Sequence, residues 1–151
     1  MVMRNKPPVR LERRFTASPE RVYDAWLDPD LAGSWMLGAT PAEQAPVRLN
    51  SDRQVGGSFS FLIRRQGAQI EYVGRYLQMK RPYRLVFTWG IAGVSEDQSR
   101  VIVDLLPAGS GCDLTLTHEL SSAWMDDTAQ TEGGWITRLE ALATVLGETT
   151  L

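Results

Sequence analysis

The feature that most constrains the fold of this chain is a run of short segments in which apolar and polar residues alternate. Alternation with a period of two is typical of strands that bury one face and leave the other in water. Short turns separate the segments, which favours antiparallel neighbours. A single long amphipathic segment follows, at residues 131–146. The sequence therefore predicts an α+β fold in which one C-terminal helix covers a meander of strands.

The width of that helix limits how much of the sheet it can cover. A helix is about 10–12 Å across and strands lie roughly 4.8 Å apart, so one helix spans only about two or three strands. We expect a curved antiparallel sheet of about six to seven strands that wraps around the helix. The hollow of such a sheet is either filled by bulky side chains or left as a cavity, and the sequence leaves both alternatives open.

The first part of the chain carries two helix-start signals. Residues 9–17 alternate and predict a strand with one wet face. Ser18 is a candidate helix N-cap, and Pro19 fits the first helical position. Asp28 and Pro29 repeat this signal. Two short helices are therefore expected after the first strand.

The rest of the chain is a loop followed by the meander. Residues 37–47 hold two prolines and little periodicity, which indicates a loop, and residues 47–54 are a weak candidate for an edge strand. The other candidate strands are residues 58–65, 68–79, 83–91, 100–106 and 112–120. The length fits one domain over residues 1–151, with disorder expected in about the first eight residues.

Glycines occur at unusual positions in this pattern. Gly133 and Gly134 lie inside the predicted C-terminal helix, where each costs roughly 0.5–1 kcal/mol relative to alanine. Close packing of helix on sheet, or a bend where the helix starts, is the preferred explanation, and a gap shaped by a ligand is the alternative. Gly74 lies in mid-strand, where a bulge or a sharp bend is expected.

Composition excludes several classes of protein. Cys112 is the single cysteine, so neither an internal disulfide nor a zinc site built from cysteines is available. No segment resembles a secretion signal or a membrane span, which predicts a cytoplasmic location. Residues 1–90 carry 14 Lys/Arg against 8 Asp/Glu, whereas residues 91–151 carry 2 against 10. The preferred explanation is that the two halves lie side by side with complementary charges. Nucleic-acid binding is not expected, because the sequence contains no stripe of basic residues.

Alternation predicts which side chains face the hollow of the sheet. The candidate ligand-binding residues are Phe59, Phe61, Tyr72, Phe87, Trp89, Val103, Leu116, His118, Gly134 and Trp135. Aromatic faces would supply apolar contact, and His118 with the Tyr72 hydroxyl would orient the ligand. The prediction is a site for a small hydrophobic or aromatic molecule, in a monomer or a homodimer.

The titratable residues argue against most enzyme chemistries. His118 is the single histidine, and a structural role is its preferred interpretation. Cys112 on the same strand lies roughly 20 Å from it, too far for a nucleophile and base. Glu71 would be a general base only if its strand took the opposite phase. We therefore predict no catalytic residues, no metal and no cofactor, with a cofactor-independent cyclase or hydrolase as an alternative.

Several motifs together resemble a known family. They are FTASPERVYDAW, DPDLAGSW, VGGSFSF, GRYL, RLVFTW, LTLTH and GGWITRLEAL, which run in order from Val9 to Leu146. They are similar to homologues of the activator of the heat-shock protein 90 ATPase, within the START-related, birch-pollen-allergen-like (SRPBCC) superfamily.

The resemblance implies a helix-grip fold and several kinds of function. The superfamily includes lipid and hormone binders as well as polyketide cyclases and aromatases. A co-chaperone-like or stress-response module that contacts a chaperone or another protein is a further alternative, with the basic half as the candidate face. Members often carry a histidine three positions before the Gly-Trp pair. Thr131 stands there in this chain, so no role of that histidine is carried over.

Overall fold

The computed structural model of the chain describes residues 8–28, 35, 44–65, 67–93, 99–120 and 128–147. Its elements are, in order, β1 (Val9–Phe15), α1 (Pro19–Leu27), β2 (Gln44–Ser51), β3 (Ser58–Arg65), β4 (Ala68–Lys80), β5 (Arg84–Ile91), β6 (Ser99–Ala108), β7 (Gly111–Glu119) and α3 (Thr128–Val145). The helix predicted at Asp28 and Pro29 falls, except for Asp28 and Trp35, outside the described residues. So do residues 1–7 and most of the predicted loop at 37–47.

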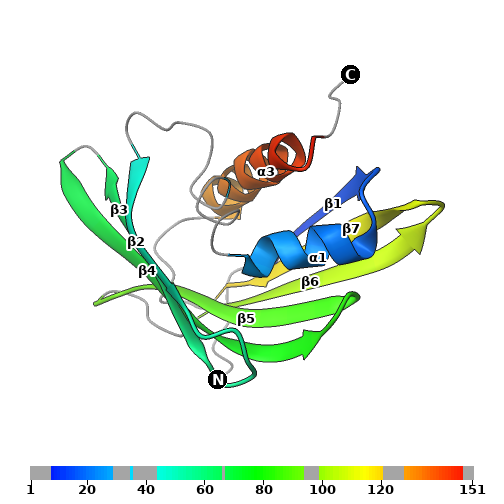
Figure 1. Ribbon diagram of the computed structural model, residues 1–151. Helices are drawn as coiled ribbons and strands as arrows, with labels where there is room; N and C mark the ends of the chain where they lie inside the picture. Colours follow the sequence, from blue (N-terminus) through cyan, green and yellow to red (C-terminus); the bar gives the residue numbers. More distant parts are fainter. Residues whose placement is uncertain are drawn as a thin grey trace, which may run out of the picture.

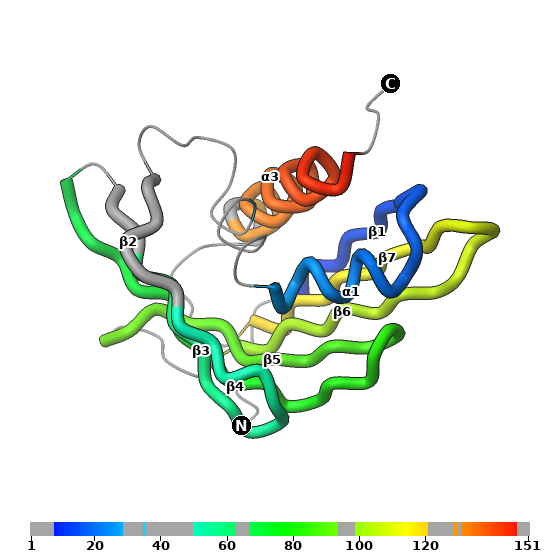
Figure 2. The backbone as a smooth tube through the Cα atoms, in the orientation of Figure 1, coloured from blue at the N-terminus to red at the C-terminus, as the bar shows by residue number. Residues whose placement is uncertain are grey.

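The strands form one antiparallel sheet of seven strands in the order β1-β7-β6-β5-β4-β3-β2. The sheet is curved, and α1 and α3 lie on its concave side (Figure 1). The tube view shows β2, β3 and β4 bending away at one end of the sheet, while β1 and β7 lie at the other (Figure 2). This arrangement confirms the predicted curved sheet around a long C-terminal helix.

Alternation places the inward side chains where the sequence predicts them. On β6, Val101, Val103 and Leu105 are buried and their neighbours are not. Leu114 and Leu116 continue the apolar layer on β7. Trp135, Leu139, Leu142 and Leu146 form the buried stripe of α3, as the helical spacing predicts. The core is therefore the apolar layer between the concave face of the sheet and these helices.

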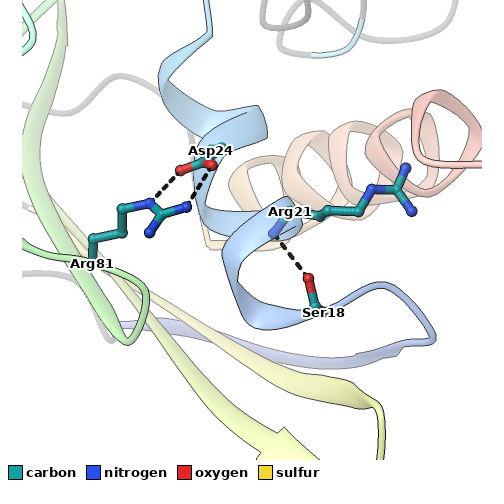
Figure 3. A network of polar contacts seen from close by, with 4 residues as sticks. All are labelled: Ser18, Arg21, Asp24 and Arg81. Carbon is teal, nitrogen blue, oxygen red and sulfur yellow. Dashed lines mark hydrogen bonds and ion pairs between the residues drawn. The ribbon is translucent and has the colours of Figure 1, made fainter.

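The start of α1 confirms the predicted cap. The Ser18 hydroxyl accepts a hydrogen bond of 3.2 Å from the backbone N–H of Arg21, and Pro19 occupies the first turn. Two atoms of the Arg81 guanidinium donate to the Asp24 carboxylate over 2.8 and 2.9 Å (Figure 3). This ion pair ties the outer side of α1 to the turn between β4 and β5.

The edge strand β2 differs from its prediction. It begins at Gln44, so the predicted loop at residues 37–47 ends earlier than expected. Pro46 pairs with Ile63, and the register shifts between Pro46 and Arg48. An edge strand with a bulge tolerates proline because its unpaired side needs no N–H donor, which is why Pro46 did not prevent a strand here.

Gly74 is a site of close contact, and the predicted bulge is not found at this position. A Cβ at this position would lie 2.0 Å from the Thr88 carbonyl oxygen and 2.3 Å from the Phe59 ring. The register shift of β4 lies further along, between Tyr76 and Gln78. Glycine is needed here because the Phe59 ring lies directly over the backbone of β4.

The glycine pair in α3 has a different explanation from the predicted one. A Cβ on Gly133 would meet no described atom within 4 Å, so close packing of the helix on the sheet does not require glycine there. A Cβ on Gly134 would lie 3.1 Å from Nη1 of Arg138. The group that approaches the helix backbone is therefore the side chain one turn further along the same helix.

The opposite charges of the two halves do meet across the sheet. Arg14 on β1 pairs with Asp113 on β7 over 2.8 Å, and Arg84 on β5 pairs with Asp104 on β6 over 2.8 Å. The first pair is exposed and the second is half-buried, and each joins a residue of the basic half to one of the acidic half. None of the described helices is long and apolar enough to cross a membrane.

Candidate functional site

Buried aromatic side chains converge on the concave face of the sheet. We call them the aromatic cluster: Trp26 from α1, Phe59 and Phe61 from β3, Tyr72 and Tyr76 from β4, Phe87 and Trp89 from β5, and Trp135 from α3. Each of them is at most 9% exposed. The cluster contains every predicted aromatic site residue. Trp26 and Tyr76 complete it, although neither was among the predicted site residues.

Trp89 is the central ring of the aromatic cluster. Its centroid lies 5.0 Å from that of Tyr72, and the two rings are stacked at 13°. The Trp135 ring lies 5.6 Å away and the Phe59 ring 6.0 Å away. Offset and edge-on contacts at these distances each stabilise a core by about 0.5–1.5 kcal/mol beyond burial. The rings therefore support one another across four elements, β3, β4, β5 and α3.

A void of about 10 Å³ remains inside the aromatic cluster. Its lining consists of Trp26, Phe59, Phe61, Tyr76, Leu85 and Phe87. A volume of this size is about that of one water molecule. Among the described residues, the rings around this void pack against one another. The void lies between α1 and the sheet, whereas the cavity was predicted between the sheet and the C-terminal helix.

His118 is held by hydrogen bonds on both ring nitrogens. The indole Nε1–H of Trp135 donates to Nδ1 of His118 over 2.9 Å, and Nε2 lies 2.8 Å from the Ser99 hydroxyl. Because an indole N–H can only donate, Nδ1 accepts and the ring proton must be on Nε2. His118 then donates to Ser99, whose hydroxyl donates to the backbone carbonyl of Trp89.

Burial and, to a smaller extent, the positive charge of Arg138 together lower the pKa of His118 from 6.5 to about 3. The imidazole is therefore neutral at physiological pH. Its bonds connect the central Trp89 of the cluster to Trp135 on α3 through Ser99. This geometry gives His118 the structural role that was its preferred interpretation.

Arg138 lies against the cluster from the side of α3. Its guanidinium carbon is 5.0 Å from the Trp135 ring centroid, 5.5 Å from that of Trp89 and 5.7 Å from that of Tyr72. The side chain is half-buried. Sequence reasoning missed this residue, although a signal existed. Arg138 stands one helical turn after Gly134 and is the single Lys or Arg of residues 128–145.

The other predicted site residues lie in different surroundings. Val103 and Leu116 pair across β6 and β7 and belong to the buried core, but they do not line the void. Gly134 is half-buried beside Arg138. The Tyr76 hydroxyl lies 2.9 Å from that of Ser51, and burial raises the pKa of Tyr76.

Glu71 does not meet the condition for a general base in the hollow. Its neighbour Tyr72 takes the inward phase of β4, which leaves Glu71 on the opposite face, where it accepts a hydrogen bond from Ser60. Among the side chains that the structure describes, no three of His, Cys, Asp and Glu are grouped so that they could hold a metal ion. The chemistry that the site offers is apolar contact with one cation at its edge.

A curved antiparallel sheet that wraps a long C-terminal helix, with an aromatic layer between them, defines the helix-grip class of fold. The family model described as activator of Hsp90 ATPase homolog 1-like protein matches residues 16–147, and the chain belongs to this family. The resemblance found in the sequence motifs is thereby confirmed. No curated protein matches the chain.

Solved structures agree with this assignment. Protein CV1439 from Chromobacterium violaceum is 25% identical, with a TM-score of 0.81 over 94% of this chain and 98% of that one. An AHSA1-like protein from Aeromonas hydrophila is 22% identical, with a TM-score of 0.78 over 93% of this chain and 92% of that one. CalU16 from Micromonospora echinospora is 24% identical, with a TM-score of 0.69 over 92% of this chain and 75% of that one. These three structures have the same fold as the chain.

Proposed function

We propose that the protein is a cytoplasmic binder of a small hydrophobic or aromatic molecule and that the ligand occupies the aromatic cluster. The observation that carries this proposal is the void among the rings, which is lined by aromatic residues of α1, β3, β4 and β5. Sites for small molecules are mostly apolar, with a few polar groups that fix orientation. The cluster has this composition, because its rings carry a few polar groups, among them the Tyr72 and Tyr76 hydroxyls, and the Arg138 guanidinium lies at its edge.

Binding at this site requires the rings to move. A void of about 10 Å³ admits no organic ligand as it stands. The wall formed by α1 is the part that can open with least loss, since the Arg81–Asp24 pair that fastens its outer side is exposed. A ligand would enter beneath Trp26 and replace ring-to-ring contacts with contacts to itself. Such a mechanism needs no metal and no cofactor.

Thermal unfolding with a neutral fused-ring compound tests this function. We expect 2-naphthamide, within a panel of aromatic and aliphatic alcohols and amides, to raise the melting temperature. A compound present at about 100 times its Kd adds about 2.7 kcal/mol to the free energy of unfolding. A panel in which no compound raises the melting temperature or changes tryptophan fluorescence would contradict the proposal.

Two matched variants locate the site. Phe59→Leu removes a ring that lines the void, whereas Phe15→Leu removes an equally buried ring on β1 outside the cluster. Both substitutions remove a similar amount of apolar contact from the core of the unliganded protein. The shift caused by 2-naphthamide should shrink in Phe59→Leu and persist in Phe15→Leu. Equal shifts in the two variants would place the ligand elsewhere.

A second candidate function is contact with a chaperone, and a specific surface favours it. Tyr83 and Leu106 are 53% and 65% exposed, and both line a shallow groove of about 530 Å³ on the outer face of the sheet. Arg10, Lys80 and the ion pair between Arg84 and Asp104 also line this groove. Exposed apolar residues beside cations suit a partner segment that is both apolar and acidic.

Stimulation of the ATPase of a purified Hsp90 chaperone tests this candidate. The paired change Tyr83→Ser and Leu106→Ser should abolish the stimulation, whereas Val55→Ser, at a 63% exposed position outside the groove, should leave it intact. The effect should weaken as salt is added, because the cations contribute to the contact. An unstimulated ATPase, or equal stimulation by all variants, would rule out this function.

A further inference from the structure

We propose that the indole N–H of Trp26 selects the ligand, which carries an uncharged carbonyl oxygen on an apolar ring and accepts a hydrogen bond from this group. The inference rests on the proposed binding function and deepens it by naming the ligand class. It starts from Nε1 of Trp26, which is buried and has no hydrogen-bond partner among the described residues. Trp26 is 3% exposed and lines the void in the aromatic cluster.

Two neighbouring tryptophans show what a buried indole ordinarily has. Nε1–H of Trp35 donates to the Ala25 carbonyl over 2.9 Å, and Nε1–H of Trp135 donates to Nδ1 of His118 over 2.9 Å. Nearly all buried donors in proteins are paired in this way, because an unpaired donor loses its hydrogen bonds to water without replacement. Trp26 therefore lacks an acceptor that both neighbours have, at a position beside empty space.

The rings that pack against Trp26 do not supply that acceptor. The Trp35 ring lies edge-on with its centroid 4.6 Å from that of Trp26, and the Trp135 and Phe87 rings lie at 6.0 and 6.1 Å. An indole N–H can only donate, and ring faces accept hydrogen bonds only weakly. The contacts of Trp26 are thus apolar contacts, which leave the hydrogen-bonding capacity of Nε1 unused.

The rest of the void's lining offers little more. Apart from Trp26, four of the lining side chains are phenylalanines or a leucine, which carry no hydrogen-bonding atom. The fifth is Tyr76, whose hydroxyl lies 2.9 Å from that of Ser51 and is engaged there. The acceptor for Trp26 is therefore expected from a molecule that enters the void.

The surroundings require this acceptor to be uncharged. The lining contains no acidic or basic side chain, and burial raises the pKa of Tyr76, so its hydroxyl is neutral at physiological pH. A carboxylate brought into the void would lose its hydration without meeting an opposite charge there, which is costly. A carbonyl oxygen loses much less hydration, and one N–H donor replaces it.

A carbonyl also suits the void better than a water molecule does. The void of about 10 Å³ has the volume of one water. Buried waters typically make about three hydrogen bonds, whereas apolar cavities stay dry. One indole N–H holds a water poorly, but it satisfies a carbonyl whose remaining atoms are apolar. Aromatic ketones and related carbonyl compounds have this chemistry.

Two compounds of nearly equal shape isolate the acceptor. 2-Acetylnaphthalene carries a carbonyl oxygen where 2-isopropenylnaphthalene carries a methylene group. Since water solvates the ketone better, the readout is the affinity for the ketone divided by the affinity for the hydrocarbon, compared between protein variants. Trp26→Phe keeps a ring and removes the N–H, and we expect it to lower this ratio roughly ten-fold.

Tyr76→Phe is the matched control. It also removes one polar group from the lining of the void, but that group is already engaged by Ser51, so the ratio should stay as in the wild type. Isothermal titration measures both affinities, with circular dichroism to verify folding. An unchanged ratio in Trp26→Phe, or a ratio that falls only in Tyr76→Phe, would overturn the role of Trp26 alone.

NMR of the wild-type protein gives a test that needs no variant. The indole proton of Trp26 should resonate further downfield in the complex with 2-acetylnaphthalene than in that with 2-isopropenylnaphthalene. Both compounds carry the same naphthalene, so their ring currents are alike and the difference reports the hydrogen bond. Equal positions of this resonance in the two complexes would contradict the hydrogen bond. Binding of neither compound would overturn the proposed function together with it.

Discussion

Trp135 donates its indole N–H to Nδ1 of His118 across 2.9 Å, and this bond joins α3 to β7. On the other side of the imidazole, Ser99 connects His118 to the backbone of Trp89 at the centre of the aromatic cluster. Each donor in this series of hydrogen bonds has one acceptor, so the network holds the imidazole of His118 in its neutral form. Protonation at Nδ1 would place two donors face to face.

The first prediction concerns the pH dependence of stability. The pKa of His118 falls from 6.5 to about 3 in the folded protein. Between these values the unfolded chain holds a proton that the folded protein lacks, so the free energy of unfolding falls as the pH decreases below about 6.5. We expect a loss of about 2 kcal/mol from His118 between pH 8 and pH 5. Urea unfolding at the two pH values measures it.

His118→Gln is the control for this effect. Glutamine does not titrate, and the carboxylates of the chain respond to pH alike in both proteins. The difference in pH dependence between wild type and variant therefore isolates the imidazole. Parallel curves for the two proteins would show that His118 is not buried as a neutral group.

The second prediction concerns the donor to His118. Trp135→Phe removes the indole N–H, so Nδ1 loses its partner and becomes free to accept a proton. We expect the pKa of His118 to rise from about 3 toward its ordinary value and the free energy of unfolding to fall by about 1–3 kcal/mol. An NMR titration of the imidazole resonances measures the pKa directly.

Trp35→Phe provides a matched control for that experiment. Trp35 is also buried, and its indole N–H donates to the Ala25 carbonyl over 2.9 Å. Its loss should destabilise the protein to a similar extent without changing the pKa of His118. A pKa that moves equally in both variants would point to general loosening of the core instead of the specific bond.

The third prediction compares the two glycines of α3. Gly133→Ala should raise the free energy of unfolding by about 0.5–1 kcal/mol, since alanine favours the helix and no described atom lies near the added Cβ. Gly134→Ala should raise the free energy of unfolding by a smaller amount, because Nη1 of Arg138 must move away from a contact of 3.1 Å. Chemical unfolding of both variants checks the order, and equal gains would contradict it.

The fourth prediction concerns Gly74 in β4. Gly74→Ala places a Cβ within 2.3 Å of the Phe59 ring and 2.0 Å of the Thr88 carbonyl oxygen. Because one of these neighbours is backbone, rotation of a side chain cannot relieve the clash. We expect a loss of about 3 kcal/mol or more in the free energy of unfolding. A loss below about 1 kcal/mol would mean that β4 and β5 separate easily at this point.

The strands and helices that the sequence predicted are those with strong local signals. Alternation located β3 through β7, and Ser18 with Pro19 marked the start of α1, because burial on one face and capping of a helix end are decided by neighbouring residues. β2 was the weakest prediction. Its proline, Pro46, is tolerated by the edge position, and that position is set by the whole sheet.

The site was predicted only in part, for a related physical reason. Alternation showed that Phe59, Tyr72 and Trp89 face inward, but the curvature of the sheet decides that a ring from α1 and a guanidinium from α3 meet them. The same limit applies to His118. Its inward direction follows from the strand, whereas its bond to Ser99 joins residues that are 19 positions apart.

The place of β1 in the sheet has a consequence for how the protein is made. β1 pairs with β7, and the ion pair between these strands joins residues 99 positions apart. During synthesis β1 therefore stays unpaired, with the apolar side chains of Val9 and Phe15 exposed to solvent, until β7 has left the ribosome. The hairpins from β2 to β6 can close one after another in the meantime, so the pairing of the first strand with the last is the late and slow event of folding.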